Sequence, residues 1–151
     1  MSSFSSGQLL RIRSKGRIGT RVGAIIPEFV VSYHSNAAAP GAASQWLFSA
    51  PRACRIVAIR ETHSTAGAGA SVLNLRKHAA GQTGAPSAAV SGTAVQELVT
   101  GGVAADGSAN VPRAATVVTA AGANQLAKDA KIALVTPATW IGMVELYLVW
   151  D

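Results

Sequence analysis

The sequence contains few charged side chains, few aromatic rings and a single cysteine. Charged residues make up 13% of its 151 residues, about half of the share in an average soluble domain. Because a soluble monomer normally presents more charge to water, we expect much of the surface to be covered by copies of the chain or by a larger assembly. The alternative is a monomer whose surface is built from small, uncharged residues.

Cysteine is nearly absent, since Cys54 is the only one. A lone cysteine excludes an intramolecular disulfide and a cysteine-based zinc site, and it fits synthesis in a reducing cytoplasm. No apolar run approaches the ~18 residues that a membrane span needs. The basic N-terminus also has no apolar segment after its charges, so we expect neither a secretory signal nor a membrane association.

Acidic residues are absent before Glu28, which concentrates the positive charge at the start of the chain. Five of the 13 basic residues lie there, at odd positions only: Arg11, Arg13, Lys15, Arg17 and Arg21. In an extended backbone alternate side chains point to opposite faces, so these cations would share one face and Leu10, Ile12 and Ile18 the other. The pattern predicts an extended basic N-terminal arm or edge strand within residues 1–23, followed by one domain over residues 24–151.

The rest of the chain lacks a convincing long helix and is typical of short strands separated by turns. Runs rich in β-branched and aromatic residues cover residues 24–35, 45–51, 54–63, 71–78, 113–121, 131–136 and 140–150. We therefore predict an all-β fold of about eight strands, either a β-sandwich or a barrel. Residues 94–99 fit a helical segment as well as a strand.

The last of these strands shows a clear alternation. One face carries Ile141, Met143, Glu145, Tyr147 and Val149, and the other carries Trp140, Val144, Leu146, Leu148 and Trp150. Together with Trp46, the two tryptophans of the second face could form a sugar-stacking platform. Packing in the core or at a subunit interface is the interpretation we favour.

No pattern of catalytic or metal-binding residues is present. The acids Glu28, Glu61, Glu145, Asp106 and Asp129 form no paired-carboxylate motif, and we interpret them as ordinary surface or turn residues. The three histidines match no zinc spacing, and His63 before Ser64 lacks the nucleophile elbow of a hydrolase. We expect His63 to cap a turn at a strand end, and we expect neither enzymatic activity nor a cofactor.

Three segments, in this order, resemble small structural proteins of tailed-phage virions: SAPRACRIVAIRETHSTAGAGASVLNLRKHAAGQTGAP, NQLAKDAKIALVTP and MVELYLVW. In those proteins a strand leads through a His-Ser-Thr-Ala-Gly-like turn into a second strand. A bend then precedes another strand, and a last strand closes the sheet. Here the bend is Leu126, Ala127, Lys128 and Asp129, with Lys128 where the family often has glycine. The resemblance covers roughly residues 50–151 and leaves the basic arm outside.

The resemblance implies that the fold of about eight strands is a jelly-roll-like antiparallel β-sandwich. It also implies a capsid decoration, or cement, protein without enzymatic activity. Such proteins lie on the outer surface of the capsid in the virion, often as trimers, and join neighbouring major capsid proteins. It therefore implies synthesis in the host cytoplasm, the major capsid protein as partner, and self-association into a homo-oligomer. A receptor- or glycan-binding head of a fibre or tail is the alternative, but loops of Ala, Gly, Ser, Thr, Asn and Pro offer little for specific binding.

Three roles compete for the basic arm. A basic stripe is typical of phosphate binding, but no aromatic residue lies between Phe4 and Phe29 to stack on bases. A solvated tail without a partner is the second role. We favour the third, in which the extended arm docks on an acidic protein surface through backbone hydrogen bonds and arginine–carboxylate pairs. Nucleic acid is accordingly not an expected partner.

Overall fold

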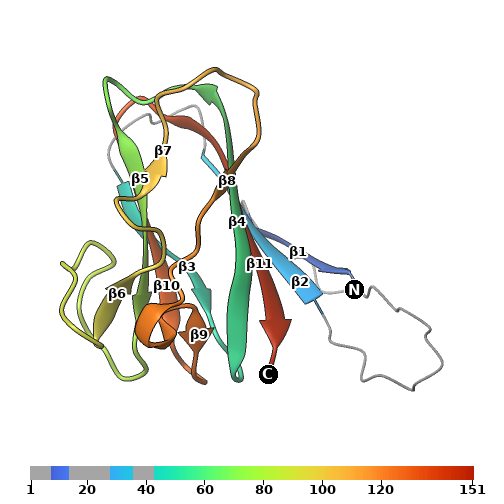
Figure 1. The fold of residues 1–151 in the computed structure, drawn as a ribbon, viewed down its shortest axis with the longest axis vertical. Helices are drawn as coiled ribbons and strands as arrows, with labels where there is room; N and C mark the ends of the chain where they lie inside the picture. The colour runs from blue at the N-terminus through green and yellow to red at the C-terminus, as the bar shows by residue number, and fades with distance from the viewer. Residues whose placement is uncertain (1–7, 14–27, 36–42) are drawn as a thin grey trace.

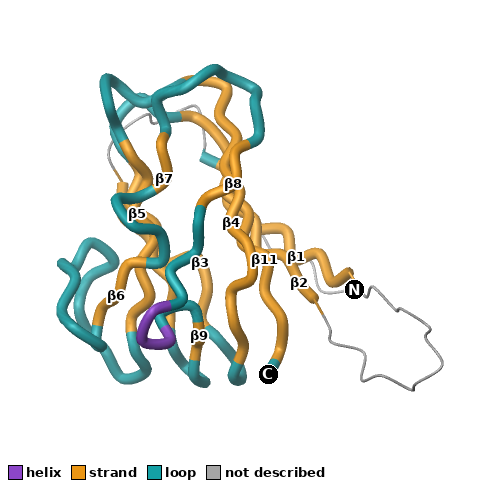
Figure 2. Tube along the Cα trace, viewed as in Figure 1, coloured by secondary structure: helices purple, strands orange, loops and turns teal. Residues whose placement is uncertain are grey.

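The computed structural model describes residues 8–13, 28–35 and 43–151. Eleven strands form two antiparallel sheets that pack face to face (Figures 1 and 2). The larger sheet contains, in spatial order, β1 (Gln8–Arg13), β2 (Glu28–His34), β11 (Ile141–Trp150), β4 (Cys54–Thr65) and β8 (Arg113–Ala115), with β9 (Gln125–Leu126) also paired to β4. The smaller sheet contains β3 (Ala43–Ser49), β10 (Lys131–Thr136), β5 (Val72–His78) and β6 (Val95–Glu97), with β7 (Val103–Ala104) also paired to β5.

This architecture confirms the predicted all-β, jelly-roll-like sandwich. The strand count exceeds eight because β7 and β9 are only two residues long and lie in segments that the sequence presents as loop or bend. Residues 94–99, which fitted either structure, contain strand β6. The only helical element in the described part of the chain is a single 3-10 turn, η1 (Ala120–Gly122).

The core lies between the two sheets and follows the period-two pattern of the strands. In β11, Val144, Leu146 and Leu148 are fully buried, whereas the residues between them are partly exposed, as the alternation predicted. The smaller sheet contributes Leu75 and Leu134 from its two central strands, which are 1% and 0% exposed. The buried residues of both sheets form one continuous core between the layers.

A β-bulge explains the unbroken apolar run in β4. The register against β11 shifts at this point, so that Ile56 lies opposite Leu148 while Ala58 lies opposite Tyr147. Val57 is the extra residue, and it is 48% exposed. The bulge lets Ile56 and Ile59 both point into the core although they are three residues apart.

The first part of the predicted arm belongs to the sandwich. Strand β1 pairs antiparallel with β2 and forms one edge of the larger sheet, with Arg11 at the register position opposite Val30 and Arg13 opposite Glu28. Leu10 and Ile12 take the positions opposite two core residues of β2. The remaining residues assigned to the arm, Lys15, Arg17, Ile18 and Arg21, lie outside the described residues.

The segment after β8 joins the two sheets on the other flank. Val117 forms a β-bridge with Val99, and the Val118 N–H donates to the carbonyl oxygen of Leu98 at 2.9 Å. The segment thus leaves the larger sheet after Ala115 and continues beside the smaller one, which is why only three of residues 113–121 are strand. Among the described residues, no helix has the length and apolar character needed to cross a membrane.

Candidate functional site

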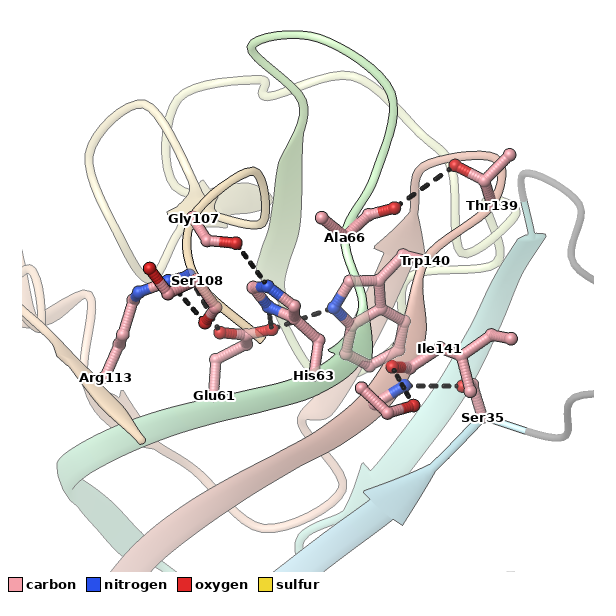
Figure 3. A network of polar contacts seen from close by, with 12 residues as sticks. Ser35, Glu61, His63, Ala66, Gly107, Ser108, Arg113, Thr139, Trp140 and Ile141 are labelled. Carbon is pink, nitrogen blue, oxygen red and sulfur yellow. Dashed lines mark hydrogen bonds and ion pairs between the residues drawn. The ribbon is translucent and has the colours of Figure 1, made fainter. Parts of the chain in front are cut away.

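A buried polar cluster lies at one end of the sandwich, where β4 meets the loop of residues 105–112 (Figure 3). Glu61 and His63 are two residues apart in β4 and therefore project from the same face, toward the core. Their exposed fractions are 0% and 1%. Trp140, just before β11, and Arg113 of β8 complete the cluster.

The carboxylate of Glu61 is the centre of this cluster. Its Oε1 accepts a hydrogen bond from the indole Nε1 of Trp140 at 2.8 Å and lies 2.6 Å from Nδ1 of His63. Its Oε2 lies 3.8 Å from a guanidinium nitrogen of Arg113. A buried carboxylate is costly unless such partners surround it, and here three side chains from three strands or strand ends supply them.

The other half of the cluster holds the 105–112 loop. His63 Nε2 lies 3.0 Å from the carbonyl oxygen of Gly107, and Arg113 donates to the carbonyl oxygen of Ser108 at 2.9 Å. The backbone N–H of Asn110 also donates to the carbonyl oxygen of His63 at 2.6 Å. A Cβ added at Gly107 would lie 2.0 Å from the Arg113 guanidinium, so a larger residue here would require the Arg113 side chain to move.

The cluster acts as an anchor in this conformation, because both ring nitrogens of His63 and Oε1 of Glu61 contact groups of this chain. A histidine beside a carboxylate is two-thirds of a catalytic triad, but the far ring nitrogen of His63 contacts a backbone carbonyl instead of a nucleophile. Ser64, the next residue, is exposed and its hydroxyl bonds the carbonyl oxygen of Ile141 at 3.3 Å. The arrangement fixes a loop to a sheet and leaves no open space at the imidazole.

The interpretation of Glu61 as an ordinary surface or turn acid was wrong, since it is fully buried. A signal for this was present in the sequence, because Glu61 and His63 continue the inward-facing parity of Ile59. The sequence predicted that His63 caps a turn at the end of a strand. In the structure His63 lies two residues before the end of β4, and its ring contacts the carbonyl oxygen of Gly107 in the 105–112 loop. What the sequence lacked was any sign of Arg113, Trp140 and Gly107 as partners, because these lie 44 to 79 residues away.

A second group of polar residues lies on the smaller sheet. The Trp46 and His78 rings meet edge-on at 4.7 Å between centroids, and the Lys131 ammonium lies 4.6 Å from the centre of the indole. Burial, together with the positive charges of Lys131 and Arg76, holds the pKa of His78 below its usual value. Lys77, also lowered in pKa by burial, donates to the carbonyl oxygens of Gly122 and Gln125 and so ties the two sheets together.

The three tryptophans do not form one platform. Trp140 is 2% exposed and packs within the core of its own chain. Trp150 stacks on Phe29 with 4.2 Å between ring centroids, and the Arg52 guanidinium lies 4.8 Å from the centre of its ring. Trp140 and Trp150 stand at opposite ends of β11, and Trp46 belongs to the other sheet, so only Trp46 and Trp150 keep partial exposure for a subunit interface.

The outward side of β11 is a broad, partly apolar surface, which we call the outer β11 face. It consists of Ile141, Met143, Glu145, Tyr147 and Val149, all partly exposed. The Tyr147 hydroxyl donates to the Glu145 carboxylate at 3.2 Å, and the exposed Arg60 lies over the tyrosine ring at 5.3 Å. Tyrosine, methionine and arginine are enriched in the centres of protein–protein interfaces, so this face has the composition of a binding surface.

No group of three or more histidine, cysteine or acidic side chains that could hold a metal ion occurs in the part of the chain that the structure describes. Comparisons with protein-family models, with curated protein sequences and with solved structures find no match.

Proposed function

We propose that this chain is a non-enzymatic capsid decoration, or cement, protein of a tailed phage. It binds the outer surface of the capsid as a closed three-fold oligomer and joins neighbouring major capsid subunits. The segments that resemble such proteins support this proposal by their place in the fold. They supply β4 and β5, then β9 and β10, and finally β11, which together include the central strands of both sheets.

The outer β11 face is the observation that carries the proposal. Four of its five residues are apolar or aromatic, and they lie on the central strand of the larger sheet, where a partner surface can reach them. A face of this kind is typical of a protein that is covered in its working assembly. The low share of charged residues in the whole chain agrees with that role.

In the proposal, the basic segment belongs to the same binding surface as the outer β11 face, and the position of β1 supports this. Strand β1 is two strands away from β11 on the larger sheet, and the basic run continues directly beyond it in the sequence. In the proposal, Lys15, Arg17 and Arg21 pair with carboxylates of a capsid subunit. In a trimer three such arms act together, so weak single contacts give strong binding.

The test is decoration of purified, undecorated capsids, imaged by cryo-electron microscopy and quantified by co-sedimentation. The triple variant K15Q/R17Q/R21Q leaves β1 intact and should bind about 3-fold to 150-fold more weakly, since three surface ion pairs contribute about 0.2–1 kcal/mol each. The control R52Q/K128Q removes two exposed cations elsewhere and should bind like the wild type. Absence of wild-type density on capsids, with salt-sensitive retention of DNA, would refute the proposal and assign the arm to phosphate binding.

A further inference from the structure

Strand β4 has a gap on the side away from β11. Strand β9 pairs with Cys54 and Arg55, and β8 pairs with residues 59–61. Between them, residues 56–58 have no strand partner on this side within the described chain. Asn124 fills part of the gap, because its carbonyl oxygen accepts from the Ile56 N–H at 2.9 Å and its side chain donates to the Ile56 carbonyl oxygen at 3.1 Å.

A surface groove of about 460 Å³ lies along this gap; we call it the β4 groove. Its lining includes the bulged residue Val57, Ala58 and, from the facing segment, Ala114, Ala115 and Val117. Because these side chains are small, they leave room for the backbone of another chain to approach β4. Val57 is 48% exposed and is one of three large apolar residues that are exposed in the described part of the chain.

Arginines stand at both ends of the β4 groove, and its lining contains no acidic residue. Arg55 lies opposite Val149 of β11, and Arg60 lies opposite Glu145. Because Val149 and Glu145 are four residues apart, the bulge in β4 places the two arginines on the same face of the sheet. Their separation along the strand matches four residues of a partner strand, roughly 13 Å. The Asp151 carboxylate is 3.7 Å from Arg55, but both side chains are about half exposed, so this pair is weak and exchangeable.

We infer that the β4 groove binds an extended segment of a partner protein that carries two carboxylates four residues apart with a small apolar residue between them. The carboxylates pair with Arg55 and Arg60, and the apolar residue covers Val57. A second copy of this chain does not supply such a segment. No two of its acids are four residues apart, and the nearest pair, Glu145 and Asp151, lies within and just after β11, which is already paired on both sides.

The inference rests on the proposed function only in identifying the partner as a capsid subunit. The direct test is therefore made without capsids, by titrating the ¹⁵N-labelled protein with the peptide acetyl-Glu-Thr-Val-Thr-Glu-amide and recording amide chemical shifts. We expect shifts confined to residues 55–60 and 114–117, and at least threefold weaker binding for the glutamine peptide acetyl-Gln-Thr-Val-Thr-Gln-amide. The variant R55Q/R60Q should lose the response, whereas R52Q should keep it.

Three outcomes of the titration would overturn the inference. The first is the absence of shifts up to about 10 mM peptide, which corresponds to negligible affinity. The second is equal binding of both peptides, and the third is a set of shifts on another surface. Because the spectrum of R55Q/R60Q also reports its fold, loss of response in a folded variant is distinguishable from unfolding.

Capsid binding then tests the identity of the partner with matched variants. Val57 and Val111 are both 48% exposed, and only Val57 lines the β4 groove. We expect V57D to weaken capsid binding at least tenfold and V111D to leave it unchanged. Equal binding of both variants would overturn the capsid assignment. Failure of the wild type to bind capsids would refute the proposed function. The peptide titration would still test whether the β4 groove binds an acidic segment.

Discussion

Replacing Glu61 with alanine removes the acceptor that three side chains share. The variant would leave the Trp140 indole N–H and the His63 ring without their partner, and the Arg113 guanidinium without the nearby carboxylate. These polar groups would lose their partner at a buried site, since Glu61 is fully buried and His63 is 1% exposed. The side chains left behind cannot regain water without opening the 105–112 loop.

The expected loss of stability follows from this burial. Removing one member of a buried charged network costs about 3–5 kcal/mol in the free energy of unfolding. For a domain of this size, 1 kcal/mol corresponds to about 2–4 °C in Tm, which gives a decrease of roughly 6–20 °C. Glu61→Gln keeps the shape and one acceptor oxygen for Trp140, so its loss should be smaller, about 1–3 kcal/mol.

Urea unfolding followed by tryptophan fluorescence measures both variants, and Trp140 reports directly on the cluster. Hydrogen exchange should show faster opening of residues 105–112 in Glu61→Ala, because the contact from His63 to Gly107 depends on the same network. As a control, Glu97→Ala changes a partly exposed acid on the short strand β6 and should stay within about 0.5 kcal/mol of the wild type. A loss below about 1 kcal/mol for Glu61→Ala, or unchanged exchange in the loop, would show that the network does not hold this end of the sandwich.

Three further predictions concern Gly142, Cys54 and His78. Gly142→Ala should destabilise the protein by at least about 1 kcal/mol in urea unfolding, because its Cβ would lie 2.5 Å from the carbonyl oxygen of Thr62; a neutral effect would contradict this packing. The Cys54 thiol should react with Ellman's reagent at pH 8 only on unfolding, because burial and the nearby Asp151 carboxylate raise its pKa to about 11; fast labelling of the native protein would be inconsistent with this. Stability should fall as the pH drops below about 6.5, because the lowered pKa of His78 means that the unfolded chain binds a proton that the folded chain does not; His78→Gln should flatten this part of the pH profile, and an unchanged slope would assign it to other groups.

The sequence determined the class of fold and much of the core. Period-two alternation in the last strand identified Val144, Leu146 and Leu148 as buried, because register is specified wherever one face of a strand lies in the core. The odd spacing of the basic residues indicated an extended conformation, and residues 8–13 do form strand β1. These features are local, so a single stretch of sequence contains the information that decides them.

Only the tertiary structure decided which residues of the chain contact one another. Nothing near Glu61 in the sequence indicates Trp140 or Arg113, since sheet pairing brings them together from distant strands. The unbroken apolar run around Val57 gave no sign of a bulge, because which residue is pushed outward depends on the register of β11. The same holds for the β4 groove, which exists only because β8 and β9 pair with different parts of one strand edge. Local sequence sets which face of each strand is apolar, and the pairing of remote strands sets which polar groups meet.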